Sequence, residues 1–171
     1  EFDKVVMGQE KAKQALALSL VLFEKNIDTA RPERIPVLLL IGPTGSGKSL
    51  LSECVRDASP LPFTYCAVPS LSNTSYRGAS LLSHLKTLTS DIPYGIMWID
   101  EIDKLFVKND IPHDGYKDLM QQELIGYVGA KTVSVNGTGE DSQLITVQVQ
   151  MNQILFIFSG AFFGLDRILA K

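Results

Sequence analysis

The stretch GPTGSGKS at residues 42–49 constrains the fold of this chain more than any other feature. It fits the pattern G-x-x-x-x-G-K-[ST] at every fixed position. An apolar run at 36–41 comes before it, and a segment with helical character, 48–57, follows it. Glycines let a backbone turn tightly around a phosphate, and the N-terminus of the next helix adds a positive dipole. We therefore expect a strand, a phosphate-binding loop and a helix, in that order.

The polar residues of this stretch predict how it would bind a nucleotide. Lys48 supplies a point charge for the β- and γ-phosphates, and the Ser49 hydroxyl can hold Mg²⁺. A glycine-rich turn that happens to end in Lys-Ser is the alternative, but both flanking segments favour the phosphate site. The expected nucleotide contacts are Gly42, Pro43, Thr44, Gly45, Ser46, Gly47, Lys48, Ser49 and Leu50.

Two adjacent carboxylates, Asp100 and Glu101, follow the apolar run at 96–99. They come at the carboxyl end of an expected strand, the edge at which open α/β sheets bind ligands. Asp100 can position Mg²⁺, and Glu101 can orient and polarise the attacking water, general-base work that contributes ~10²–10⁴-fold. The alternative is a helix N-cap, because Asp and Glu favour first turns, and both roles can hold at once. Beside a phosphate-binding loop we favour the catalytic interpretation.

Ser159 interrupts the apolar run at 154–158, where that strand should reach the same edge of the sheet. Its hydroxyl could contact the γ-phosphate or the attacking water. The strand could equally end there in a simple turn residue, and the residues alone leave both interpretations open. With the loop and the carboxylate pair, the sequence predicts a P-loop nucleoside triphosphatase that takes ATP and Mg²⁺.

Apolar runs alternate with helical patterns along the chain. The fold class is therefore α/β, a three-layer P-loop sandwich with a mostly parallel central sheet. Strands are expected at 36–41, 62–68, 95–100 and 154–159, and helices at 9–26, 48–57, after Gly78, near 105–106, at 116–127 and at 162–169. We expect the strand at 36–41 to be buried on both faces. The β-rich runs 131–135 and 143–149 flank the turn-like NGTGED and predict an inserted hairpin.

Composition narrows the class of protein. The net charge of −3 provides no global basic field, so neither nucleic acid nor an anionic membrane is expected as a partner. The longest apolar runs fall far below the ~18 residues that span a bilayer. Cys54 and Cys66 form no CxxC motif, which argues against a zinc site, and we expect both to be buried in a reducing, cytoplasmic compartment. Because the chain starts without Met, we expect a piece of a longer protein.

Four segments resemble the AAA+ ATPases, specifically the large domain of the ClpX and HslU type of protein unfoldase. They are VVMGQEKAKQAL, IGPTGSGKSLL, GIMWIDEIDKL and ILFIFSGAFFGLD, and the resemblance extends over nearly the whole chain. It implies one large ATPase domain over residues 1–171, without the small helical lid domain. It also implies that Val6 and Met7 border the adenine and that Ser159 is the residue called sensor 1.

The resemblance also assigns a role to Tyr76 and Arg77, in the stretch TSYRG. Unfoldases of this type carry a Gly-Tyr-Val-Gly loop after the second strand, which projects into the pore of a hexameric ring. Residues 75–78 occupy that place, although Ser and Arg replace Gly and Val. A literal GYVG at 126–129 comes after the strand that ends in the carboxylates, so we expect it to close a helix instead. On the residues alone, Tyr76 could also pack under its own loop.

The predicted function is ATP hydrolysis that powers protein unfolding and translocation in a homohexameric, ClpX-like chaperone. The resemblance implies a polypeptide substrate and a possible peptidase partner. The arginine finger and the sensor 2 arginine would lie beyond residue 171, so we expect the isolated chain to hydrolyse ATP weakly. Two alternatives remain open: an AAA+ nucleic-acid motor of the branch-migration or clamp-loader type, and an ATP-switched assembly scaffold without translocation.

Overall fold

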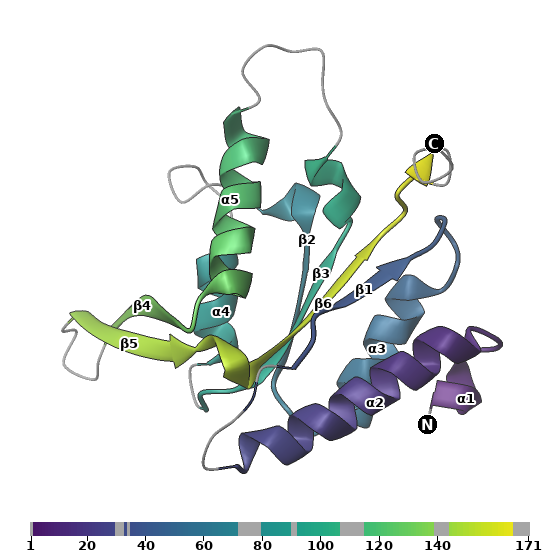
Figure 1. Ribbon diagram of the computed structural model, residues 1–171, viewed down its shortest axis with the longest axis horizontal. Helices are drawn as coiled ribbons and strands as arrows, with labels where there is room; N and C mark the ends of the chain where they lie inside the picture. The colour runs from purple at the N-terminus through teal and green to yellow at the C-terminus, as the bar shows by residue number, and fades with distance from the viewer. Residues whose placement is uncertain are drawn as a thin grey trace.

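A four-stranded parallel sheet forms the centre of the protein (Figure 1). The computed structural model describes residues 2–29, 33, 35–71, 80–89, 92–106, 115–138 and 144–165. Its strands are β1 (Leu38–Ile41), β2 (Phe63–Ala67), β3 (Gly95–Asp100), β4 (Thr132–Thr138), β5 (Leu144–Gln150) and β6 (Ile154–Gly160). Its helices are α1 (Phe2–Val5), α2 (Glu10–Ile27), α3 (Lys48–Ala58), α4 (Leu81–Leu88) and α5 (Gly115–Gly129), with 3₁₀ turns η1 (Val68–Ser70), η2 (Ile102–Leu105) and η3 (Met151–Gln153). The strand order is β1-β6-β3-β2.

The alternation of side chains along β3 separates two buried clusters, one on each face of the sheet. Ile96 and Trp98 pack with residues of α2 and α3 on one face. Met97 and Ile99 pack with residues of α4, α5 and the hairpin on the other. Both clusters contain fully buried side chains, so the sheet lies between two helical layers. The predicted three-layer α/β fold is confirmed.

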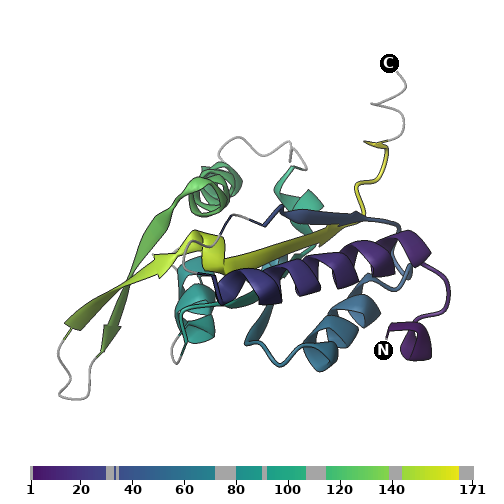
Figure 2. The same cartoon turned by 60° about the horizontal axis from the view of Figure 1, so that its bottom comes forward.

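Most predicted elements lie within a few residues of the observed ones. The apolar stripe at 9–26 forms α2, with Leu16, Leu20 and Phe23 buried. The two β-rich runs form the antiparallel pair β4–β5, which projects beyond the sheet (Figure 2). GYVG is the last turn of α5, where the Ala130 N–H donates to the Gly126 carbonyl, so it closes a helix as predicted.

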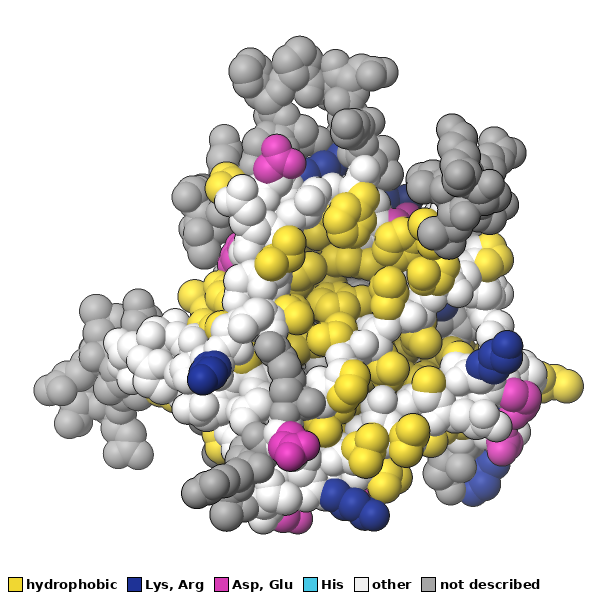
Figure 3. Space-filling model, in the orientation of Figure 1, with side chains coloured by type: hydrophobic (Ala, Val, Ile, Leu, Met, Phe, Trp, Pro, Cys, Tyr) yellow, Lys and Arg dark blue, Asp and Glu magenta, His cyan; other side chains and the backbone are white. Residues whose placement is uncertain are grey.

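The prediction that β1 is buried on both faces is wrong. Leu39 is 49% exposed and Ile41 is 51% exposed, whereas Leu38 and Leu40 are partly buried against α2 and α3. The physical reason is that α2 and α3 cover only one face of β1, whereas Leu39 and Ile41 lie on the other face and belong to neither buried cluster of the described residues. Figure 3 shows hydrophobic side chains gathered over this face of the sheet, between α5 and α2.

Three predicted features fall wholly or partly outside the described residues. Tyr76 and Arg77 lie outside them, and so does the tip of the hairpin, 139–143. Of the helix expected at 162–169, only residues 162–165 are described, and Leu165 alone is helical. Within the described ranges, no helix combines the length and the apolar character needed to cross a membrane.

Candidate nucleotide-binding site

The loop between β1 and α3 depends on glycine at three places. Gly45 and Gly47 have φ angles of 81° and 88°, in the left-handed region that other residues rarely adopt. At Gly42, a Cβ would lie 2.8 Å from Ser46 Oγ, so glycine allows this close approach without moving the Ser46 side chain. The loop then leads directly into α3 at Lys48. Its backbone and the helix N-terminus therefore form the kind of cradle that binds a phosphate group.

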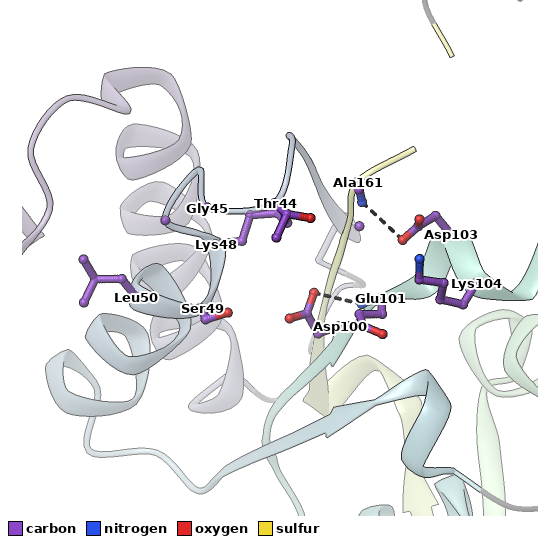
Figure 4. A pocket seen from close by; sticks show the side chains of 12 residues that line it. Thr44, Gly45, Lys48, Ser49, Leu50, Asp100, Glu101, Asp103, Lys104 and Ala161 are labelled. Carbon is purple, nitrogen blue, oxygen red and sulfur yellow. Dashed lines mark hydrogen bonds between the residues drawn. The ribbon is translucent and has the colours of Figure 1, made fainter. Parts of the chain in front are cut away.

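This loop forms one wall of a pocket of about 310 Å³ (Figure 4). The opposite wall comes from the carboxyl ends of β3 and β6 and from η2. The lining residues are Thr44, Gly45, Gly47, Lys48, Ser49, Leu50, Asp100, Glu101, Asp103, Lys104, Gly160 and Ala161. The structure thus brings the predicted residues Lys48, Ser49, Asp100 and Glu101 around one pocket. Other predicted contacts, Gly42, Pro43 and Ser46, lie in the same loop.

The Lys48 ammonium group rests against its own loop. Its Nζ donates to the Gly42 carbonyl at 2.5 Å and to the Pro43 carbonyl at 2.9 Å, and Ser46 Oγ lies 3.4 Å away. All three partners are neutral oxygens. A phosphate oxygen would make a stronger, charge-assisted bond to the same group. The loop therefore fits a nucleotide phosphate.

Asp100 is buried and is held by three donors. Its Oδ1 accepts hydrogen bonds from Ser159 Oγ at 2.5 Å and from the Glu101 N–H at 2.8 Å. Its Oδ2 accepts from the Tyr65 hydroxyl at 2.7 Å. Asp100 and Ser49 face one pocket with a carboxylate and a hydroxyl, oxygen ligands of the kind that Mg²⁺ takes. These two residues therefore fit the predicted metal.

Ser159 is fully buried and is absent from the residues that line the pocket. Its hydroxyl accepts from Trp98 Nε1 at 2.8 Å and donates to Asp100. Trp98 is fully buried in the core, and the hydrogen bond of its indole was not predicted. In this arrangement the Ser159 hydroxyl bonds the proposed metal ligand rather than facing the pocket. Its contact with a γ-phosphate stays a prediction.

Glu101 is exposed at the pocket and has a φ angle of 56°. A left-handed conformation is strained for a residue with a side chain, so neighbouring contacts must hold the Glu101 backbone in it. The Glu101 N–H bonds Asp100 Oδ1, and its carbonyl accepts from the Lys104 N–H. Glu101 occupies the N-cap position of η2, but its side chain makes no capping hydrogen bond. The N-cap alternative therefore has no support from the Glu101 carboxylate.

Sequence reasoning missed Asp103, which is 7% exposed. Its Oδ1 accepts from the Ala161 N–H at 3.2 Å and so ties η2 to the end of β6 (Figure 4). A Cβ at Gly160 would lie 2.7 Å from the same oxygen, so the close approach depends on glycine. The only signal in the sequence is a third acidic residue in DEIDK.

Sequence reasoning also missed Tyr65, on β2. Partial burial and the hydrogen bond to Asp100 raise the pKa of the Tyr65 phenol, which keeps its proton and remains a donor. Its contact with Asp100 depends on the pairing of β2 with β3, where Tyr65 lies opposite Trp98. No local pattern in the sequence predicts that β2 pairs with β3 in this register.

The segment before α2 lies against the phosphate loop. Gln9 Nε2 donates to the Ser46 carbonyl at 2.9 Å. Lys13 Nζ bonds Asp3 Oδ1 at 2.6 Å and Glu10 Oε1 at 2.8 Å, and the bond to Asp3 raises the pKa of Lys13. Val6 is buried and Met7 is 95% exposed, and neither lines the pocket. Their assignment to the adenine stays a prediction.

A family model described as "ATPase family associated with various cellular activities (AAA)" matches residues 38–161. This range runs from the first strand of the sheet to the residue that follows the last one. The chain belongs to the AAA ATPase family. Nucleotide binding follows from that membership, and the geometry of the pocket agrees with it.

Three relatives extend the similarity over nearly the whole chain. Two are named "ATP-dependent Clp protease ATP-binding subunit ClpX": that of Treponema denticola is 33% identical over 97% of this chain and 44% of its own length, and that of Borrelia duttonii is 31% identical over 99% and 44%. A subunit named ClpX 2 from Wolinella succinogenes is 32% identical over 96% and 46%. The chain therefore spans a little under half the length of these relatives. The resemblance predicted from the four motifs is confirmed, and the chain is a ClpX-like AAA+ domain.

Proposed function

We propose that this domain binds ATP together with Mg²⁺ and hydrolyses the γ-phosphate. One observation carries the proposal. Four predicted residues line one pocket from its two opposite walls: Lys48 and Ser49 from the phosphate loop and α3, and Asp100 and Glu101 from the end of β3. Each has the chemistry that phosphoryl transfer to water requires: a cation, a hydroxyl, a metal-holding carboxylate and a base.

Binding would begin at the loop. The backbone N–H groups between Gly45 and Ser49, at the start of α3, would hold phosphate oxygens. Lys48 Nζ would exchange the Gly42 and Pro43 carbonyls for phosphate oxygens. Ser49 and Asp100 would hold Mg²⁺, which neutralises charge on the phosphates when it is bound.

Glu101 would act as the general base. Its carboxylate lies at the pocket, and its backbone is fixed by hydrogen bonds on both sides of the residue. It would orient the attacking water and accept its proton. Asp100 is less suited to this step, because three hydrogen bonds stabilise its carboxylate as an anion and it is the proposed metal ligand.

At the level of the whole protein, we propose a homohexameric unfoldase in the cytoplasm that pulls on a polypeptide through loops bearing Tyr76 and Arg77. The names of the relatives, which describe an ATP-binding subunit of a Clp protease, support this proposal. They also support a peptidase as a partner. ATP hydrolysis by the isolated 171-residue chain would then be weak, as the sequence predicts.

The test is Glu101→Gln in the full-length protein. We expect ATP affinity to stay within about twofold of the wild type, while turnover falls about 10²–10⁴-fold, the range of general-base catalysis. Glu53→Gln, at an exposed position of α3, is the matched control and should keep turnover. Undiminished turnover in Glu101→Gln would show that another group is the base. Equal loss of binding and turnover would show that Glu101 has a structural role.

A further inference from the structure

Tyr65 connects β2 to the carboxylate at the end of β3. Its register partner is Trp98, so its side chain lies on the same face of the sheet as α3 and two residues before the level of Asp100. The phenol extends along the sheet to the level of Asp100, and its hydroxyl donates to Asp100 Oδ2 at 2.7 Å. The residue is 42% exposed. Tyr65 therefore contributes little as a core residue, and its strongest contact is with a buried carboxylate.

The donors around Asp100 leave little choice in how the carboxylate is oriented. A carboxylate oxygen accepts about two hydrogen bonds. Ser159 Oγ and the Glu101 N–H fill Oδ1. Tyr65 fills one position of Oδ2 and leaves one position for the proposed metal or for a water bound to it. The two carboxylate oxygens therefore have different donors, and the hydrogen bond from the Tyr65 hydroxyl fixes the orientation of Oδ2.

A second pocket, of about 320 Å³, lies beside the first between α3 and β2. Tyr65 lines it together with Ser49, Ser52, Glu53, Arg56 and Phe63. Ser49 lines both pockets. Tyr65 therefore lines one pocket with Ser49, one proposed metal ligand, and hydrogen-bonds the other, Asp100.

We propose that Tyr65 is a positioning residue for the Mg²⁺–nucleotide complex: its hydroxyl holds Asp100 so that the remaining acceptor position of Oδ2 faces the pocket. This inference rests on the proposed Mg²⁺-dependent nucleotide binding. It adds a residue on β2 to a site otherwise built from the phosphate loop, β3 and β6. Tyr65 would act through Asp100 and touch neither the nucleotide nor the metal.

Tyr65→Phe in the full-length protein removes the hydroxyl and keeps the ring. Binding of a fluorescent ATP analogue would be measured with EDTA and again over a series of Mg²⁺ concentrations. We expect affinity in EDTA to stay within about twofold of the wild type, because the phosphate loop is unchanged. The gain in affinity that Mg²⁺ provides should fall about three- to tenfold, because Asp100 loses one of three donors.

Tyr127→Phe is the matched control. Tyr127 also donates from its hydroxyl to a carboxylate, Glu123 Oε1 at 2.9 Å, but within α5 and outside the pocket. Its Mg²⁺-dependent gain should equal that of the wild type. Melting temperatures of both variants, measured without nucleotide, report any general loss of structure.

The outcomes separate this inference from the proposed function. If Mg²⁺ raises the nucleotide affinity of Tyr65→Phe as much as that of the wild type, the positioning role is overturned while the proposed metal site stands. The same conclusion follows if Tyr65→Phe loses the same factor of affinity with Mg²⁺ and in EDTA. The same holds if Tyr127→Phe loses as much of the gain. A wild-type protein whose nucleotide affinity does not respond to Mg²⁺ overturns the proposed metal site, and the role of Tyr65 with it.

Discussion

Replacing Ser159 with alanine removes a single oxygen atom, yet we expect it to destabilise the nucleotide-free chain strongly. The hydroxyl is fully buried, accepts from Trp98 Nε1 and donates to Asp100 Oδ1. A buried donor left without a partner costs ~1–3 kcal/mol, and a hydrogen bond to a charged group contributes ~1.5–3 kcal/mol. Asp100 keeps two other donors, which offsets part of the loss. We therefore expect the free energy of unfolding to fall by about 2–4 kcal/mol.

Urea denaturation provides the measurement. Trp98 is the single tryptophan of the sequence, is fully buried and donates to the Ser159 hydroxyl, so its fluorescence reports the loss of this environment. With a urea m-value of ~2 kcal/mol/M, the expected loss shifts the midpoint by about 1–2 M. Ser70→Ala, which removes an exposed hydroxyl bonded to the Ala67 carbonyl, should change stability by less than about 0.5 kcal/mol. A Ser159→Ala midpoint no further displaced than that control would refute the reasoning.

Two further predictions follow from the described contacts. Gly160→Ala should weaken nucleotide binding by displacing Asp103, because the new Cβ would meet Asp103 Oδ1 at 2.7 Å, and calorimetric titration with ADP would measure the loss. For Asp3, the bond to Lys13 lowers the pKa below the usual 3.8, so its stabilising contribution is present above that pH and is lost as pH falls through the lowered pKa. Urea midpoints of the wild type and Asp3→Asn should differ near pH 6 and converge near pH 2, and a constant difference would contradict the ion pair.

The elements that sequence alone predicted are those with a local signal. The helical stripe of α2, the apolar run of β3 and the glycines of the phosphate loop are each visible within a short window. The shared edge also followed, because carboxyl ends of parallel strands meet there. Lys48, Ser49, Asp100 and Glu101 therefore came together around one pocket, as expected.

What sequence could not predict depends on which elements are neighbours in space. The exposure of Leu39 and Ile41 arises because α2 and α3 pack against the opposite face of β1. The bond from Tyr65 to Asp100 requires β2 to pair with β3 in one register, 35 residues apart in the chain. The Trp98–Ser159 bond spans 61 residues and requires β3 to lie beside β6. A hydrophobic or polar pattern states which face a residue occupies, but it does not state the neighbour across the sheet.

The resting contacts of Lys48 have a consequence for affinity. Fixing a long, flexible side chain on binding costs about 0.5–1.5 kcal/mol of conformational entropy. Because Nζ already bonds the Gly42 and Pro43 carbonyls, much of that freedom is lost before any ligand arrives. The ammonium group is therefore preorganised at the loop, and it exchanges one set of oxygen acceptors for another. This arrangement favours fast nucleotide binding at a low entropic cost, because the Lys48 ammonium group moves only within its own loop.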